Sequence, residues 1–182
     1  MKRAGIQREI LLDAGAIQTA LRRMAADIAA KCDPAALALV GIQSGGVVLA
    51  RRLQALIAEK TGRKPHMGAV DITLYRDDLA KSTHFPELKA TDILFDVDGA
   101  EVVLVDDVLY TGRTIRAGLD ALMDLGRPRA VRLAVLMDRG GRELPIAPDF
   151  LGKATPAGPK QSVTVQLAET DGADQVILED LP

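Results

Sequence analysis

The residues with the clearest chemical potential lie between positions 102 and 114, in the sequence VVLVDDVLYTGRT. The segment from Tyr110 to Thr114 falls between an expected strand and an expected helix, so its backbone N–H groups point outward at the positive end of a helix dipole. Thr111 and Thr114 add hydroxyl donors, and Gly112 lets a ligand approach the backbone closely. The pattern therefore predicts a loop that binds a phosphate group.

The two acids before this loop, Asp106 and Asp107, must hold a different part of the same ligand. A carboxylate placed roughly 4 Å from a phosphate repels it by about 4 kcal/mol per pair of unit charges at an effective dielectric constant near 20. A ribose with free 2′- and 3′-hydroxyls would donate hydrogen bonds to both carboxylates while its 5′-phosphate binds the loop. A positive charge that develops on the sugar would be stabilised as well. The acids and the loop together predict a ribose 5-phosphate ligand.

Other interpretations of these residues explain less of the pattern. The chain has neither a G-x-x-x-x-G-K-[ST] loop nor a G-x-G-x-x-G motif. Asp107 could simply cap the following helix while Asp106 is solvated, but this leaves the second acid and the hydroxyl-rich loop unexplained. A phosphoacceptor receiver domain also gathers acids at strand ends, yet it does not need Thr111 to Thr114 directly after them.

Strands and helices alternate around these residues. Apolar spacing predicts an amphipathic helix from Asp13 to Lys31 with Asp13 as its N-cap, a helix ending near Lys60, and a helix from Ile115 to Leu125. Expected strands cover 37–42, 68–75, 102–105 and 130–137, with short candidates near 163–167 and 176–178. Apolar strands that alternate with helices indicate an α/β fold, with a mainly parallel sheet covered by helices on both faces.

Three distinctive stretches, 43–46, 106–114 and 138–142, each follow the end of an expected strand. Parallel sheets bind ligands beyond the carboxyl ends of their strands, so these stretches are predicted to form one site. The polar segment from 76 to 98 contains Pro86 and little periodicity, which predicts a long mobile loop.

The composition is that of a globular enzyme or regulator. The chain has 182 residues, 48% apolar and 26% charged, and a formal net charge of −2, so one domain is expected and RNA binding would need a local basic patch. No apolar run approaches the roughly 20 residues that span a bilayer, and no signal-peptide core is evident. Cys32 is the single cysteine, which excludes an internal disulfide. We expect a cytoplasmic protein without membrane association.

VVLVDDVLYTGRT resembles the phosphoribosyl-pyrophosphate (PRPP) motif of type I phosphoribosyltransferases. VDITLYRDDL at 70–79 and DRGGRELPI at 138–146 resemble the PyrR family of bacterial pyrimidine-operon regulators, which are also uracil phosphoribosyltransferases. The similarity extends from about Ile10 to about Glu179. It implies the type I phosphoribosyltransferase fold as a single domain over 1–182, with a flexible loop at about 76–98 and a small hood at about 138–165 that includes the N-terminal segment.

The resemblance also implies an activity, the Mg²⁺-dependent conversion of uracil and PRPP to UMP and pyrophosphate. No certain protein ligand for Mg²⁺ is implied, because PRPP oxygens would hold most of the ion. Asp106, Asp107 and Arg76 are the implied catalytic residues. The other implied substrate-binding residues are Ser44, Gly45, Gly46, Lys81, Val108, Leu109, Tyr110, Thr111, Gly112, Arg113, Thr114, Arg139, Phe150 and Leu151, with core packing as the alternative for Phe150.

A second implied function is UMP-responsive attenuation of pyrimidine genes through binding of their leader mRNA, by a homodimer or homotetramer. The candidate RNA-binding residues are Arg22, Arg23, Arg142 and Lys153, although exposed arginines on an amphipathic helix are usually only solvated. Gly141 stands where related proteins carry histidine, and Gln43-Ser44-Gly45 replaces Lys-Thr-Arg and so removes positive charge from the pyrophosphate loop. A regulator with vestigial catalysis and a transferase for another base, hypoxanthine-guanine or orotate, are the alternatives.

Overall fold

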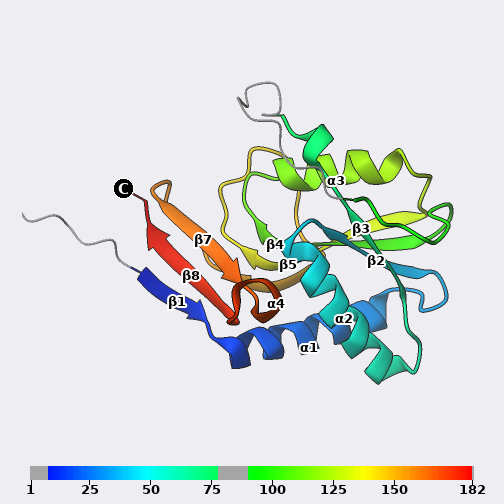
Figure 1. Cartoon of the computed structure of the whole chain (residues 1–182), viewed down its shortest axis with the longest axis horizontal. Coiled ribbons are helices and arrows are strands. Elements are labelled where there is room, and N and C mark those ends of the chain that lie inside the picture. The colour runs from blue at the N-terminus through cyan, green and yellow to red at the C-terminus, as the bar shows by residue number, and fades with distance from the viewer. Residues whose placement is uncertain (1–7, 78–89, 182) are drawn as a thin grey trace, which may run out of the picture.

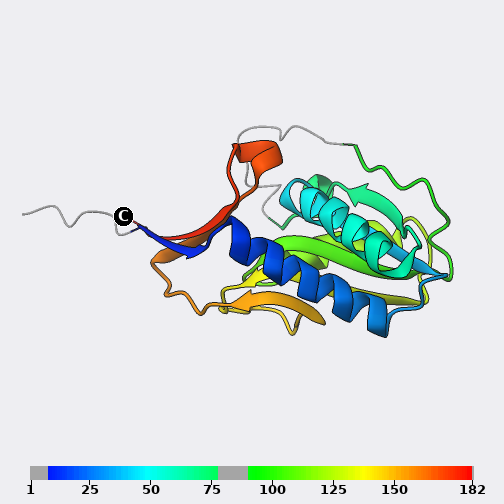
Figure 2. The same cartoon turned by 90° about the horizontal axis from the view of Figure 1, so that it is seen from below.

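The computed structural model describes residues 8–77 and 90–181. Its centre is a five-stranded sheet in which all neighbours are parallel (Figure 1). A second sheet of three antiparallel strands lies beyond one end of it (Figure 2). The main sheet has the order β3 (His66–Val70), β2 (Leu37–Ile42), β4 (Glu101–Leu109), β5 (Ala130–Asp138), β6 (Phe150–Ala154). The small sheet has the order β1 (Arg8–Leu12), β8 (Gln175–Asp180), β7 (Gln161–Gln166).

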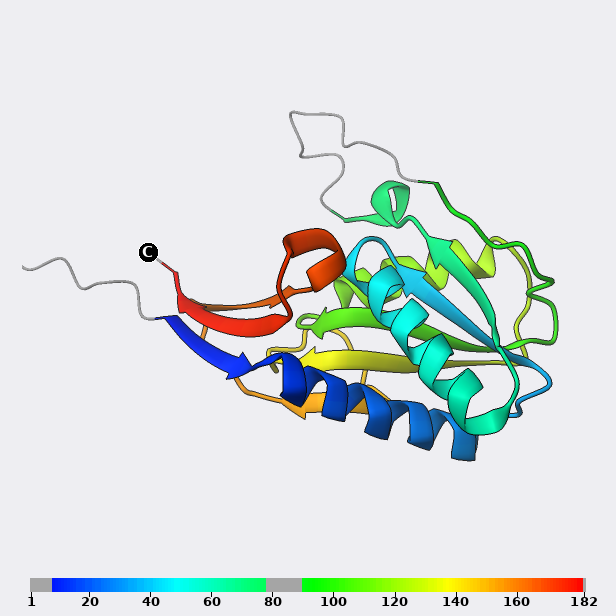
Figure 3. The same cartoon turned by 60° about the horizontal axis from the view of Figure 1, so that its bottom comes forward.

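Helices cover both faces of the main sheet, as the apolar strands predicted (Figure 3). α1 (Ala14–Lys31) and α2 (Gly45–Thr61) pack on one face, and α3 (Arg113–Met123) packs on the other. Successive side chains of a strand point to opposite faces. In β2, Leu39 accordingly joins the core under α1 and α2, while Val40 joins the core under α3. The α/β fold predicted from the sequence is confirmed.

The helix boundaries follow from local chemistry. The Ala16 N–H donates to Asp13 Oδ1 at 2.8 Å, so Asp13 is the N-cap of α1 as predicted. Gly62, at a φ of 69°, ends α2 in the left-handed conformation that glycine adopts without strain. None of the helices in the described residues has the length and apolar character needed to cross a bilayer.

Two strands differ from the sequence-based expectation. The strand expected at 68–75 ends at Val70, and Thr73–Tyr75 forms a single 3₁₀ turn instead. Asp71 Oδ1 accepts hydrogen bonds from the Thr73 N–H at 2.9 Å and the Thr73 hydroxyl at 2.5 Å, which favours a turn over an extended strand. The strand expected to end at Val105 continues to Leu109, so the paired acids lie within β4 rather than after it.

The C-terminal part of the segment predicted as a long mobile loop, 76–98, is anchored to the rest of the protein. Residues 78–89 of that prediction lie outside the described residues, but residues 90–98 are anchored to the main sheet. Asp92 and Ala69 exchange two backbone hydrogen bonds of 2.8 Å, and Val97 is 3% exposed. Asp98 Oδ1 accepts the Arg127 N–H at 2.6 Å, which fixes this segment to the turn before β5.

The small sheet corresponds in part to the predicted hood. It combines the N-terminal strand β1 with β7 and β8, and a single helical turn, α4 (Ala168–Asp171), connects the last two. It therefore extends to Asp180, beyond the predicted limit at 165. β6 lies within the predicted hood range but belongs to the main sheet, because it pairs with β5 and buries Phe150 under α1.

Candidate active site

The strand order reverses between β2 and β4, which makes their carboxyl ends the expected binding crevice of the sheet. Pairing between the two strands ends at Gly41 and Val105, so the acids that follow Val105 lie just beyond it. A cavity of about 340 Å³ occupies this position. Its lining includes Ser44, Gly45, Arg76, Asp106, Asp107 and Thr114. The structure thus brings two of the three stretches predicted from strand ends into one cleft.

The two carboxylates are held by backbone donors and are costly to ionise. Asp106 is 6% exposed, and its Oδ1 accepts the Asp107 N–H at 3.0 Å. Asp107 Oδ1 accepts the Val108 N–H at 2.7 Å. Burial raises the pKa of Asp106 well above its ordinary value, and the charge of Asp107 raises it further. Burial likewise raises the pKa of Asp107. A ligand that donates hydrogen bonds to both carboxylates would offset this cost.

This burial predicts a stability effect at Asp106. A raised carboxyl pKa means that the native state binds the proton more readily than the unfolded state, so stability falls as pH rises from the ordinary aspartate range to the raised pKa. Asp106→Asn cannot ionise and still accepts the Asp107 N–H. We expect it to be more stable than the wild type by about 1 to 2 kcal/mol at pH 7 and by much less near pH 4. Urea unfolding across this pH range, with Asp27→Asn on α1 as the control, measures the difference; parallel pH profiles would contradict it.

The loop that begins α2 is packed directly against the end of β4. The peptide bond between Gln43 and Ser44 is cis, and α2 begins at Gly45. A Cβ atom on Gly45 would lie 2.5 Å from Asp107 Oδ2, and one on Gly46 would lie 2.2 Å from the Val105 carbonyl oxygen. Both contacts are far shorter than van der Waals distance. The two glycines are thus explained by close packing against β4 and not merely by the start of a helix.

The loop between β4 and α3 forms a second cavity of about 240 Å³, lined by Arg76, Asp77, Thr111, Arg113 and Thr114. It shares Arg76 and Thr114 with the first cavity, so the two are parts of one cleft. Gly112 is the N-cap of α3 at a φ of 93° and offers no side chain to cap the helix. The first turn of α3 therefore presents its N–H groups to a ligand, which is the arrangement that favours an anion.

The Arg113 side chain, predicted to bind substrate, pairs with two acids. It donates to Asp77 Oδ2 at 2.7 Å and to Glu143 Oε2 at 2.6 Å, and these contacts raise the pKa of Arg113. Arg116, one turn further along α3, also binds Asp77, at 2.8 Å. Sequence reasoning did not find Arg116, although its spacing of three residues from Arg113 places both guanidinium groups on one side of the helix.

Arg139 and Tyr110 stack at the carboxyl end of the sheet. The Arg139 guanidinium lies 3.7 Å from the centroid of the Tyr110 ring, and the Arg139 side chain is nearly buried. Its Nη2 donates to the Gly158 carbonyl at 3.1 Å, which joins β5 to the segment before β7. Gly141 has a φ of 81°, and a Cβ atom there would lie 2.5 Å from Tyr110 Cε2. Tyr110 therefore occupies the space that a side chain at position 141 would need.

Two further residues predicted to bind substrate, Phe150 and Leu151, pack in or against the hydrophobic core. Phe150 is 2% exposed and packs in the core under α1, where Lys31 Nζ lies 5.6 Å from the ring centroid. This environment agrees with the alternative of core packing for its side chain. Leu151 packs against the opposite core, at the level of Asp106 across β5. Lys81 lies outside the described residues.

Three of the four predicted RNA-binding residues make contacts that stabilise the fold. Arg23 donates to the carbonyls of Leu151 and Gly152 in β6, and Lys153 donates to the Leu11 carbonyl in β1. Arg142 binds the Asp138 carboxylate at 2.6 Å and the Tyr110 and Ile146 carbonyls, which fixes the segment after β5. Arg22 is exposed on α1, where it borders a groove between α1 and α2.

The donor set of the cleft is compatible with Mg²⁺ held mainly by a ligand. In the part of the chain that the structure describes, no group of three or more His, Cys, Asp or Glu side chains is arranged to hold a metal ion. Asp106 and Asp107 nevertheless place oxygen ligands in the cleft. Since Mg²⁺ commonly takes one or two carboxylates together with phosphate oxygens and water, these residues fit the ion if substrate oxygens complete its coordination.

The reversal of strand order beside a buried and a half-buried carboxylate, followed by a helix start without a side-chain cap, is the arrangement of a phosphoribosyltransferase. A model of the phosphoribosyl transferase domain matches residues 7–157. Solved structures agree. A hypoxanthine phosphoribosyltransferase of Trypanosoma cruzi superposes with a TM-score of 0.70 at 18% identity, over 96% of this chain and 97% of that one. A hypoxanthine phosphoribosyltransferase from Staphylococcus aureus superposes with a TM-score of 0.69 at 20% identity, over 93% of this chain and 90% of that one. At this identity the likeness concerns the fold, and it confirms the predicted type I phosphoribosyltransferase fold.

Within that class, the chain belongs to the PyrR family. It is 50% identical to Bifunctional protein PyrR of Halalkalibacterium halodurans over 173 residues, which cover 93% of this chain and 96% of that protein. It is 52% identical to Bifunctional protein PyrR of Thermus aquaticus over 169 residues, 92% of this chain and 93% of that protein. The resemblance to the PyrR family inferred from the sequence is confirmed.

Proposed function

We propose that the protein is a cytoplasmic, Mg²⁺-dependent uracil phosphoribosyltransferase, which converts uracil and PRPP to UMP and pyrophosphate. The observation that carries this proposal is the shared cleft: the buried Asp106 and the half-buried Asp107 lie beside the start of α3, where the N-cap residue offers no side chain. The ribose 5-phosphate of PRPP combines vicinal hydroxyls with a phosphate and so matches both parts of the cleft. Membership of the PyrR family supports uracil as the acceptor.

Each part of the cleft has a distinct task in this reaction. Asp106 and Asp107 accept hydrogen bonds from the 2′- and 3′-hydroxyls, and their negative charge stabilises the positive charge that develops at C1. The backbone and hydroxyls from Tyr110 to Thr114 bind the 5′-phosphate. The Ser44–Gly46 loop binds pyrophosphate at the start of α2, and Arg76, which lines both cavities, neutralises the departing charge. N1 of uracil then displaces pyrophosphate at C1 without a covalent enzyme intermediate, so the protein acts by positioning and electrostatics.

Mg²⁺, when bound with PRPP, supplies positive charge that neutralises the diphosphate of the leaving group. Asp106 and Asp107 are the residues of this chain that would contact the ion or its water ligands. Substrate oxygens supply the remaining ligands.

The base specificity is tested by substrate competition. Purified protein with PRPP and Mg²⁺ is expected to release pyrophosphate with uracil, and not with hypoxanthine, guanine or orotate. If the protein is active only with a purine, uracil is refuted as the acceptor base. No activity with any base, together with tight UMP binding, would favour a regulator with vestigial catalysis.

We further propose that a homodimer or homotetramer binds the leader mRNA of pyrimidine genes in response to UMP, as family membership suggests. Arg22 is the candidate we favour for an RNA contact: it is exposed, whereas Arg23, Arg142 and Lys153 each donate hydrogen bonds to other parts of the protein. Filter binding to leader RNA with and without UMP, across a salt series, tests this role. Affinity should fall steeply with salt and exceed that for scrambled RNA. Equal affinity for both RNAs would refute the regulatory proposal.

A further inference from the structure

α4, which connects β7 to β8, lies beside the beginning of α2 (Figures 1 and 3). Leu167, the residue before it, is buried in the core that α1 and α2 cover. Asp171 Oδ2 accepts hydrogen bonds from the Leu167 N–H at 2.9 Å and the Thr170 hydroxyl at 2.6 Å, which brace the turn. The turn therefore lies beside the helix whose first residue, Gly45, lines the cleft.

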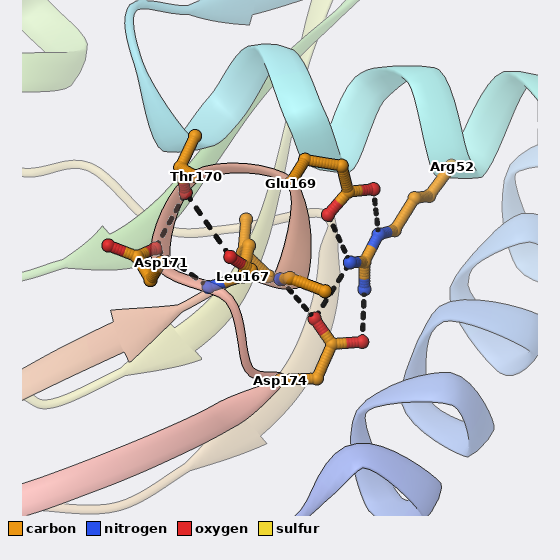
Figure 4. A network of polar contacts seen from close by, with 7 residues as sticks. Arg52, Leu167, Glu169, Thr170, Asp171 and Asp174 are labelled. Atoms are coloured by element: carbon orange, nitrogen blue, oxygen red, sulfur yellow. Dashed lines mark hydrogen bonds and ion pairs between the residues drawn. The ribbon is translucent and has the colours of Figure 1, made fainter.

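Arg52 of α2 binds two carboxylates, that of Glu169 within α4 and that of Asp174 just after it (Figure 4). Its Nη1 and Nη2 donate to the two oxygens of Asp174 at 2.8 and 2.7 Å. Its Nε donates to Glu169 Oε1 at 2.9 Å, and Nη2 also binds Glu169 Oε2. The Arg52 side chain is 17% exposed, so these pairs are partly shielded from water. Because a planar guanidinium with two bidentate partners fixes their orientation, Arg52 restrains the turn more strictly than a lysine would.

The restraint extends into the backbone of the turn. Asp174 Oδ1, which binds Arg52, also accepts the Ala168 N–H at 2.8 Å. The guanidinium, the carboxylate and the first amide of α4 therefore form one continuous chain of hydrogen bonds. The same contacts lower the pKa of both Glu169 and Asp174, so both acids are ionised at neutral pH.

α2 also carries the proposed pyrophosphate loop at its beginning. Gly45, whose missing side chain makes room for Asp107, is the first residue of the helix. Arg52 lies about 10 Å further along the same helix at 1.5 Å per residue. One rigid helix therefore connects the loop at the cleft to the turn of the small sheet.

We infer that Arg52 is a positioning residue for phosphoribosyl transfer, which holds α4 in a fixed place relative to the Ser44–Gly46 loop and Asp107. This inference rests on the proposed function. Without Arg52, Glu169 and Asp174 lose their shared partner and repel each other, and α4 loosens. The beginning of α2 then loses the fixed neighbour that α4 provides, so the Ser44–Gly46 loop is positioned less strictly against Asp107.

The test compares Arg52→Met and Arg52→Lys with Arg51→Met, which removes the same charge from the exposed neighbouring position of α2. Arg52→Met is expected to speed hydrogen exchange at the Ala168 amide about tenfold and to lower kcat about tenfold. Its Kd for PRPP, measured by calorimetry, should rise as well. Arg52→Lys should give intermediate values and Arg51→Met wild-type ones.

The outcomes separate the inference from the proposed function. Equal exchange in Arg52→Met and Arg51→Met would overturn the restraint. Faster exchange with an unchanged kcat and an unchanged Kd for PRPP would overturn positioning and leave a purely structural contact. Failure of the proposed function would instead show as a wild type that forms no UMP. In that case a larger Kd of Arg52→Met for PRPP by calorimetry, with faster exchange, would still support positioning, and an unchanged Kd would overturn it. If Arg52→Met does not fold, Asp174→Asn is expected to give smaller shifts in the same directions, and wild-type values would refute the inference.

Discussion

Asp107→Asn is expected to lower kcat for UMP formation by about 100- to 1,000-fold while the fold stays intact. Asparagine has nearly the same shape, and its Oδ1 can still accept the Val108 N–H. It lacks the negative charge, however, and its amide presents donors where the ribose hydroxyls need an acceptor. The loss should fall on kcat more than on KM, because the charge matters most when positive charge develops at C1.

Steady-state kinetics and thermal unfolding of Asp107→Asn measure these effects, with Asp27→Asn on α1 as a control for the loss of one carboxylate. The control should keep wild-type kinetics. Unchanged turnover in Asp107→Asn would refute the assignment of this carboxylate to the ribose.

Gly45→Ala is expected to cause the second-largest effect, a loss of about 100-fold in kcat/KM for PRPP. The new methyl group would lie 2.5 Å from Asp107 Oδ2, so either the carboxylate or the loop must shift. Both belong to the proposed site, which is why one carbon atom affects binding of the sugar and of pyrophosphate together.

The matched control for this variant is Gly15→Ala in the first turn of α1, where a Cβ atom meets nothing closer than Asp13 Oδ1 at 3.5 Å. It should stabilise the protein by up to about 1 kcal/mol and leave kinetics unchanged. A crystal structure of Gly45→Ala with Asp107 undisplaced, together with full activity, would contradict the expectation.

The sequence predicted most of what depends on neighbouring residues. Asp106, Asp107 and Gly112 could be chosen as candidates because the acids and the proposed phosphate loop follow one another within one strand–loop–helix unit. The main sheet was predictable for a similar reason, since strands that are apolar throughout must be covered on both faces. Asp71 shows how a short-range effect can still be missed: one carboxylate bonded to Thr73 turned an expected strand into a 3₁₀ turn.

Contacts between distant segments could not be predicted in this way. Arg52 and Glu169 are separated by 117 positions, and no periodicity in either segment indicates that they meet. Arg113 was identified through its motif, but its partner Asp77 lies 36 positions away, so the direction of its side chain was not apparent. Arg23 was chosen for its charge, whereas its environment was set by the packing of β6 against α1. The identity of a residue indicates its chemistry, and the tertiary fold decides which partner receives it.

The packing of Gly141 against Tyr110 has a consequence for how this sequence can change. A histidine at position 141 would place its Cβ atom 2.5 Å from Tyr110 Cε2, and it would also have to adopt a φ of 81°. The Arg139 guanidinium stacks on the Tyr110 ring and restrains its position. A side chain at position 141 is therefore accommodated only if the Tyr110 ring moves, so the effects of substitutions at positions 110 and 141 are expected to depend on each other.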